Sequence, residues 1–164
     1  MKKLFLIIGS CLFVTTMSCI RDTDDSHYNI LFHNEADYDV FIEDGEGDYY
    51  DTSLSWMLNV MTPGWHLKVE SHCDNIDAFF SWDTYESILK HDTLMVFVFN
   101  ADTLSTYGWD YAKEHYMVAQ RYDLSLSDLQ NLNWRLTFPP TEEMRNMKMW
   151  PSYGTYDEHG NRLK

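Results

Sequence analysis

The chain has 164 residues, of which 12 are Lys or Arg and 26 are Asp or Glu, so its formal net charge is −14 at pH 7. Hydrophobic residues make up 45% and aromatic residues 16%, which argues against a disordered chain. The negative charge argues against a nucleic-acid binder, because the phosphates would be repelled. With cysteines only at Cys11, Cys19 and Cys73, a disulfide-dense scaffold and a four-cysteine zinc site are excluded.

The N-terminus has the features of an export signal. Lys2 and Lys3 precede an apolar run over residues 4–14. As a helix this run would span roughly 16 Å, about half of a ~30 Å hydrocarbon core. Such a run is too short to cross a membrane and is typical of a signal peptide. We therefore predict that residues 1–18 are a signal peptide.

A small residue directly before a cysteine, Ser18 before Cys19, resembles the lipobox of bacterial lipoproteins, although Met17 is less usual at its position. The resemblance implies cleavage after Ser18, diacylation of the Cys19 sulfur and acylation of the new amino terminus. A single acyl chain binds membranes only marginally, whereas several chains on Cys19 would hold the protein almost permanently. The alternative is an ordinary secretory signal in which Cys19 has no role.

Residues 19–27 form an acidic tether that contains Asp22, Asp24 and Asp25. These acids resemble the acidic cluster that follows the lipidated cysteine in Bacteroidota-type lipoproteins and signals export to the outer leaflet of the outer membrane. A solvated linker is the alternative. We expect a palmitate-bearing protein of the cell envelope, held at the outer membrane by its lipid.

Strand patterns dominate the first half of the globular region, residues 28–150. Residues 28–34 are rich in strand formers and residues 38–43 alternate, so the turn between them predicts a β-hairpin. Residues 65–70 alternate again and predict another strand. Residues 82–90 have the apolar spacing of a short helix.

The centre of the chain contains an uninterrupted apolar run over residues 94–99, which predicts a central strand covered on both faces. A helix should follow, capped by Asp102 or Thr103 and weakened by Gly108. Its expected buried face consists of Leu104, Tyr107, Tyr111 and His115.

The C-terminal part continues with a strand over residues 116–124 and a short helix in which Ser127 and Gln130 have capping-box spacing. Residues 134–138 predict the last strand, whose inner face consists of Trp134, Leu136 and Phe138. From Thr141 onward we expect one short helix at most, followed by a fraying tail over residues 151–164.

These patterns predict a single α+β domain with an antiparallel or mixed sheet of about five or six strands and two or three short helices. A β-sandwich decorated with helices is the alternative. Residues 92–154, in which RYDLSLSDLQNLNW, TFPPTEEM and KMWPSYG are most distinctive, resemble the C-terminal half of small lipoproteins from gut Bacteroidota. The resemblance implies a shared secreted domain and carries over no catalytic residue.

Catalytic motifs are not found in the sequence, which contains no HExxH, no G-x-S-x-G and no glycine-rich phosphate loop before a helix. We therefore predict that the protein is not an enzyme. Calcium is the one candidate cofactor, because Asp44, Glu46 and Asp48 alternate with glycines and calcium takes several oxygen ligands from flexible loops. The loop departs from the EF-hand pattern, and an exposed acidic loop without a metal is the alternative.

Aromatic residues in expected loops form a candidate binding patch, because exposed rings can stack on sugars or on a partner protein. The patch residues are Tyr49, Tyr50, Trp56, Trp150 and Tyr153, with Tyr156 nearby in the tail.

The leading hypothesis is a lipid-anchored, non-catalytic binding or assembly module of the cell envelope, with a protein or glycan ligand. Its net charge should favour basic partners and oppose acidic polysaccharides. The alternatives are an unrecognised hydrolase acting on glycans or peptides and a calcium-dependent glycan-binding domain.

Overall fold

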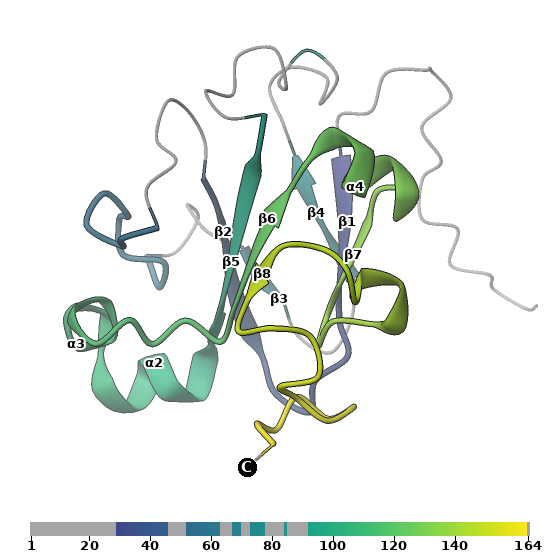
Figure 1. The fold of residues 1–164 in the computed structure, drawn as a ribbon. Coiled ribbons are helices and arrows are strands. Elements are labelled where there is room, and N and C mark those ends of the chain that lie inside the picture. The colour runs from purple at the N-terminus through teal and green to yellow at the C-terminus, as the bar shows by residue number, and fades with distance from the viewer. Residues whose placement is uncertain are drawn as a thin grey trace, which may run out of the picture.

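The computed structural model describes residues 29–45, 52–62, 67–69, 73–77, 84 and 92–163. Within them the strands form two sheets (Figure 1). In the three-stranded sheet, ordered β4-β1-β7, β1 pairs antiparallel with β4 and parallel with β7. These strands are β1 (Asn29–Asn34), β4 (Cys73–Asp77) and β7 (Arg135–Phe138).

The second sheet has five strands in the order β3-β2-β5-β6-β8, and every pairing in it is antiparallel. Its strands are β2 (Val40–Asp44), β3 (Leu67–Val69), β5 (Leu94–Asn100), β6 (Gln120–Leu124) and β8 (Met149–Trp150). Strand β5 is central, and every residue from Leu94 to Phe99 is buried, which confirms the prediction of a strand covered on both faces.

One hydrophobic core lies between the two sheets. Because successive side chains of a strand point to opposite faces, Leu94, Val96 and Val98 of β5 share one side. They belong to the same buried cluster as Phe32 of β1 and Leu136 of β7. The two sheets therefore face each other across a common core, an arrangement that also matches the sandwich alternative.

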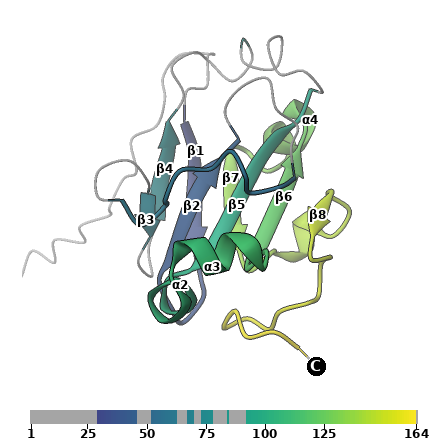
Figure 2. The ribbon, with the colours of Figure 1, turned by 90° about the vertical axis from the view of Figure 1, so that its left-hand side faces the viewer.

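A second core lies on the opposite face of β5, where Met95, Phe97 and Phe99 are buried. Two helices, α2 (Ala101–Tyr107) and α3 (Trp109–Glu114), cover this face together with residues 52–62 (Figure 2). The predicted single α+β domain is confirmed. Among the residues that the structure describes, no helix combines the length and the apolar character needed to cross a membrane.

The predicted hairpin of the first two strands is wrong, because β1 and β2 lie in different sheets. The Asn34 side chain closes the turn after β1: its amide nitrogen donates to Tyr38 O (2.7 Å), and its oxygen accepts from Ala36 N (3.1 Å). The chain thus passes from one sheet to the other, and the alternation in β2 is satisfied by pairing with β5 instead of β1.

The cap of α2 lies before the predicted one. Asn100 is the N-cap residue, and its side-chain oxygen accepts from Thr103 N at 2.7 Å, whereas Asp102 lies in the first turn. An Asn that ends a strand can serve both elements, because the N-cap keeps an extended backbone. In α4 (Leu126–Asn131), likewise, the capping box joins Ser125 to Asp128, not Ser127 to Gln130.

Gly108, with a φ of +79°, separates α2 from α3 and changes which residues are buried. Leu104 is buried as predicted, but Tyr107 and Tyr111 are 53% and 42% exposed. Trp109 and Ala112 are buried in their place. The predicted burial of the two tyrosines and of His115 is wrong, because the helical spacing that predicted it is interrupted at Gly108. The rings of these three residues stack on one another at the surface instead.

The C-terminal segment packs against the domain, so the expected fraying is wrong. After a short 3₁₀ helix η1 (Glu142–Met144), β8 pairs with β6. The Tyr156 hydroxyl donates to Ala119 O, and Tyr38 donates to Gly160 O at 2.7 Å. The predicted helix over residues 82–90 lies outside the described residues, apart from Thr84, which is helical.

Candidate binding cavity

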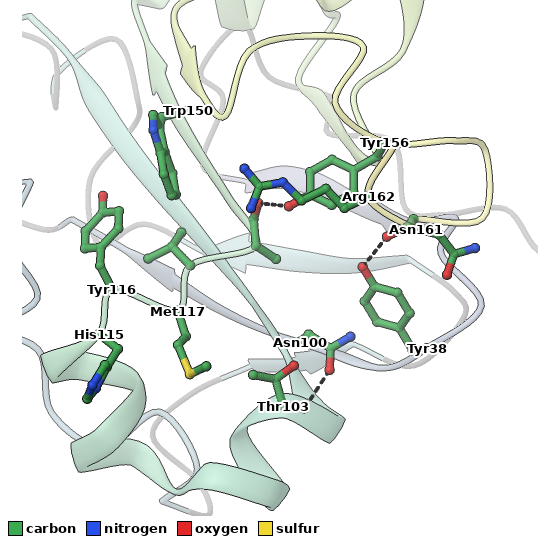
Figure 3. Close-up of a pocket in the computed structure, with 13 residues that line it drawn as sticks. Tyr38, Asn100, Thr103, His115, Tyr116, Met117, Trp150, Tyr156, Asn161 and Arg162 are labelled. Atoms are coloured by element: carbon green, nitrogen blue, oxygen red, sulfur yellow. Dashed lines mark hydrogen bonds between the residues drawn. The ribbon is translucent and has the colours of Figure 1, made fainter. Parts of the chain in front are cut away.

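A cavity of about 470 Å³ opens where the C-terminal segment meets the start of α2 and the residues between α3 and β6 (Figure 3). Its lining comes from parts of the chain that are far apart in sequence. The lining residues are Tyr38, Asn100, Thr103, His115, Tyr116, Met117, Val118, Ala119, Trp150, Tyr156, Gly160, Asn161 and Arg162.

Two aromatic side chains form one wall of the cavity. The rings of Tyr116 and Trp150 meet edge to face, with their centroids 5.1 Å apart and their planes at 67°. Trp150 is 40% exposed, so part of its indole is open to a ligand. It is held in β8, where it pairs with Arg121 of β6.

A buried ion pair supports this aromatic wall. Arg121 donates from Nη1 to the Tyr116 hydroxyl (2.9 Å) and from Nε to Asp123 Oδ1 (2.8 Å). The Asp123 side chain is fully buried, and Lys148 Nζ lies 3.4 Å from its second oxygen. Burial opposes the charge on Arg121, but its hydrogen bond and charge interaction with Asp123 outweigh that effect and raise its pKa.

The opposite wall carries polar groups. Tyr38, whose hydroxyl is bonded to Gly160 O, is mostly buried, and this burial raises its pKa to about 12 despite a hydrogen bond with Asn100. Asn161 and Arg162 reach the cavity from the C-terminal turn (Figure 3). The turn is held by Asp157, whose carboxylate accepts from the backbone N–H of Asn161 at 2.9 Å.

The lining has a composition unlike that of the chain. None of the 13 lining residues is Asp or Glu, although the chain contains 26 acids. The lining does include a guanidinium, Arg162, and an imidazole, His115, whose Nδ1 lies 3.0 Å from Tyr111 O. The described lining therefore presents hydrogen-bond donors and aromatic surface, with no carboxylate among its residues.

The predicted aromatic patch is divided in the described part of the chain. Trp150 and Tyr156 line the cavity. Trp56 is half-buried with its ring edge on Phe97, at 6.1 Å and 70°, so it packs against the second core. Tyr153 donates to Glu142 Oε2 (2.8 Å) and does not line the cavity. Tyr49 and Tyr50 lie outside the described residues.

Of the other predicted site residues, Cys19, Glu46 and Asp48 lie outside the described residues. Asp44 ends β2 and is paired with Val96 of β5. Within the described ranges, no group of three or more His, Cys, Asp or Glu side chains is arranged to hold a metal ion.

Several cavity residues escaped the sequence analysis, namely Tyr38, Asn100, Thr103, Asn161 and Arg162. Only the turn around Gly160, within DEHGN, left a local signal.

Comparison with known proteins adds no relative: no family model, no curated protein and no solved structure matches the chain.

Proposed function

We propose that this protein is anchored to the cell envelope through lipid on Cys19 and that its cavity binds a saccharide without transforming it. The leader sequence supports the anchor. The cavity supports the binding role, because its volume of about 470 Å³ lies within the range of roughly 300–1,000 Å³ that is usual for small-molecule sites.

The two walls suit a sugar ring. A pyranose has an apolar face, which can lie against the open part of the Trp150 indole. It also has peripheral hydroxyls, each of which donates and accepts. The side chains of Asn100, Thr103 and Asn161 supply amide and hydroxyl groups, which can both accept hydrogen bonds from these hydroxyls and donate to them.

The lining also favours binding over hydrolysis at this cavity. A glycosidase of the usual kind needs two carboxyl groups about 5–9.5 Å apart on either side of the scissile bond. Among the described residues that line the cavity, none carries a carboxylate, and none is a Ser or Cys that could act as a nucleophile.

The anchor is tested by incorporation of labelled palmitate into the wild-type protein and into Cys19→Ala. We expect label only in the wild type, while Cys73→Ala, which leaves Cys19 intact, should label normally. Equal labelling of the wild type and Cys19→Ala would refute the anchor.

Binding is tested on the purified, detergent-solubilised protein by following tryptophan fluorescence during titration with mixed oligosaccharides. We expect a saturable change that Trp150→Ala abolishes. Trp56→Phe, outside the cavity, should retain it. A response that persists in Trp150→Ala would place the ligand elsewhere.

A further inference from the structure

The cavity lining departs from the charge of the protein as a whole. With 26 acids against 12 bases, the chain should repel anions at long range. Of the described residues, however, no Asp or Glu lines the cavity, whereas Arg162 does. The cavity therefore favours negatively charged ligands, whereas the overall composition favours positively charged ones.

Arg162 differs from Arg121 and Arg145, which both form ion pairs. Arg121 is paired with buried Asp123, and Arg145 Nη2 lies 2.6 Å from Glu142 Oε2. Within the described part of the chain, no carboxylate lies within ion-pair distance of Arg162. Its side chain extends from the C-terminal segment toward the side of the cavity where Trp150 lies (Figure 3).

The backbone that carries Arg162 is anchored. Arg162 forms a bridge with Tyr156, and the next residue, Leu163, donates from its N–H to Thr155 O at 2.7 Å. This turn contains two carboxylates. That of Asp157 accepts from the N–H groups of His159 and Asn161, both at 2.9 Å, and Glu158 Oε1 lies 3.5 Å from His159 Nε2. The guanidinium therefore lies on a turn that is held by hydrogen bonds and in which Asp157 contacts the backbone and Glu158 contacts His159.

We propose that the cavity selects acidic saccharides and that Arg162 binds the carboxylate of a uronic-acid unit while Trp150 lies against the ring. This rests on the proposed saccharide-binding function and names the class of sugar. A guanidinium donates two parallel hydrogen bonds to a carboxylate, and such charge-assisted bonds are about twice as strong as neutral ones.

Long-range repulsion does not prevent this binding. At physiological ionic strength the Debye length is about 8 Å, so acids on distant surfaces are largely screened. A carboxylate in direct contact with Arg162 is screened far less. The general negative charge should instead slow the approach of long polyanions, so short oligosaccharides are the better probes.

The experiment compares two oligosaccharides of equal length, one ending in glucuronic acid and the other in glucose, by calorimetry on the detergent-solubilised lipoprotein. We expect the acidic sugar to bind roughly tenfold more tightly. Arg162→Met should remove this preference, and Arg162→Lys should keep part of it. The control Arg145→Met removes an exposed guanidinium outside the cavity and should leave the preference unchanged.

The outcomes separate the two proposals. Equal affinity for both sugars, or a preference that survives Arg162→Met, would overturn the acidic-sugar inference and leave saccharide binding intact. If neither sugar binds, and mixed oligosaccharides also give no Trp150-dependent signal, the proposed function itself is overturned. If Arg162→Met lowers the melting temperature, Arg162→Lys decides, because loss of the preference with the charge retained would contradict a simple charge contact.

Discussion

Arg121 and Asp123 lie two residues apart on one face of β6 and form a two-pronged ion pair, Nε to Oδ1 at 2.8 Å and Nη2 to Oδ2 at 3.1 Å. The Asp123 side chain is fully buried and that of Arg121 is 14% exposed. Because Arg121 also donates to the Tyr116 hydroxyl, the pair connects the interior of the sheet to the aromatic wall of the cavity.

Asp123→Asn should strongly destabilise the domain. The substitution leaves the Arg121 guanidinium largely buried without its counter-charge, and breaking a buried pair in this way costs about 3–5 kcal/mol. Urea unfolding measures the change in the free energy of unfolding. Glu142→Gln, which breaks the exposed pair with Arg145, is the control and should change the free energy of unfolding far less, because solvent screens exposed pairs. Similar losses in the two variants would contradict a structural role for the buried pair.

Alkaline pH should destabilise the protein through Tyr38. Burial raises the pKa of this phenol from 10.0 to about 12 in the folded state. Between these values the unfolded chain has released a proton that the folded chain retains, so stability falls as the pH rises through this window. Burial raises the pKa values of Tyr122 and Tyr156 as well. In urea unfolding from pH 9 to 11, Tyr38→Phe should show a shallower decline than the wild type, and parallel curves would exclude the Tyr38 contribution.

Gly160→Ala should disturb the C-terminal turn more than Gly154→Ala. Both glycines have positive φ, +79° and +81°, so alanine is strained at either position. A Cβ at Gly160 would also lie 2.6 Å from the Cβ of Ala36, whereas one at Gly154 would meet nothing within 4 Å. We expect a loss of about 2–4 kcal/mol for Gly160→Ala and about 1 kcal/mol for Gly154→Ala by thermal unfolding. Equal losses would mean that the segment shifts to relieve the clash.

Asn100→Ala should lower the stability of the domain by about 1 kcal/mol, because it removes the acceptor that caps α2 through Thr103 N. Asp102→Ala removes only a favourable charge in the first turn and should cost a few tenths of a kcal/mol. Chemical denaturation of both variants tests the assignment of the cap. A larger loss for Asp102→Ala would favour the cap expected from sequence.

The strands with strong local patterns were predicted well. The apolar run of β5 and the alternation of β7 depend on which residues are buried, and burial leaves a signal along the chain itself. Pairing leaves a much weaker signal. The β1–β2 hairpin failed because the Asn34 side chain, rather than a hairpin turn, closes the connection.

The candidate site was predicted only in part. Trp150 was identified because an aromatic residue outside the expected core stands out in a sequence, but Asn100 and Arg162 do not. Their roles arise from proximity, since the cavity joins residues near positions 38, 100, 116, 150 and 162. No spacing rule connects such distant positions.

By itself, the sequence determined the α+β class, the central buried strand and the charge of the chain, because each depends on composition or on short-range periodicity. It also supplies the expectation of an export leader and a lipid anchor. The tertiary structure alone decided the division of the strands between two sheets, the docking of the C-terminal segment and the carboxylate-free cavity. These features depend on contacts between residues far apart in the sequence, such as Tyr38 with Gly160, and hydrogen bonds of that kind leave no local pattern.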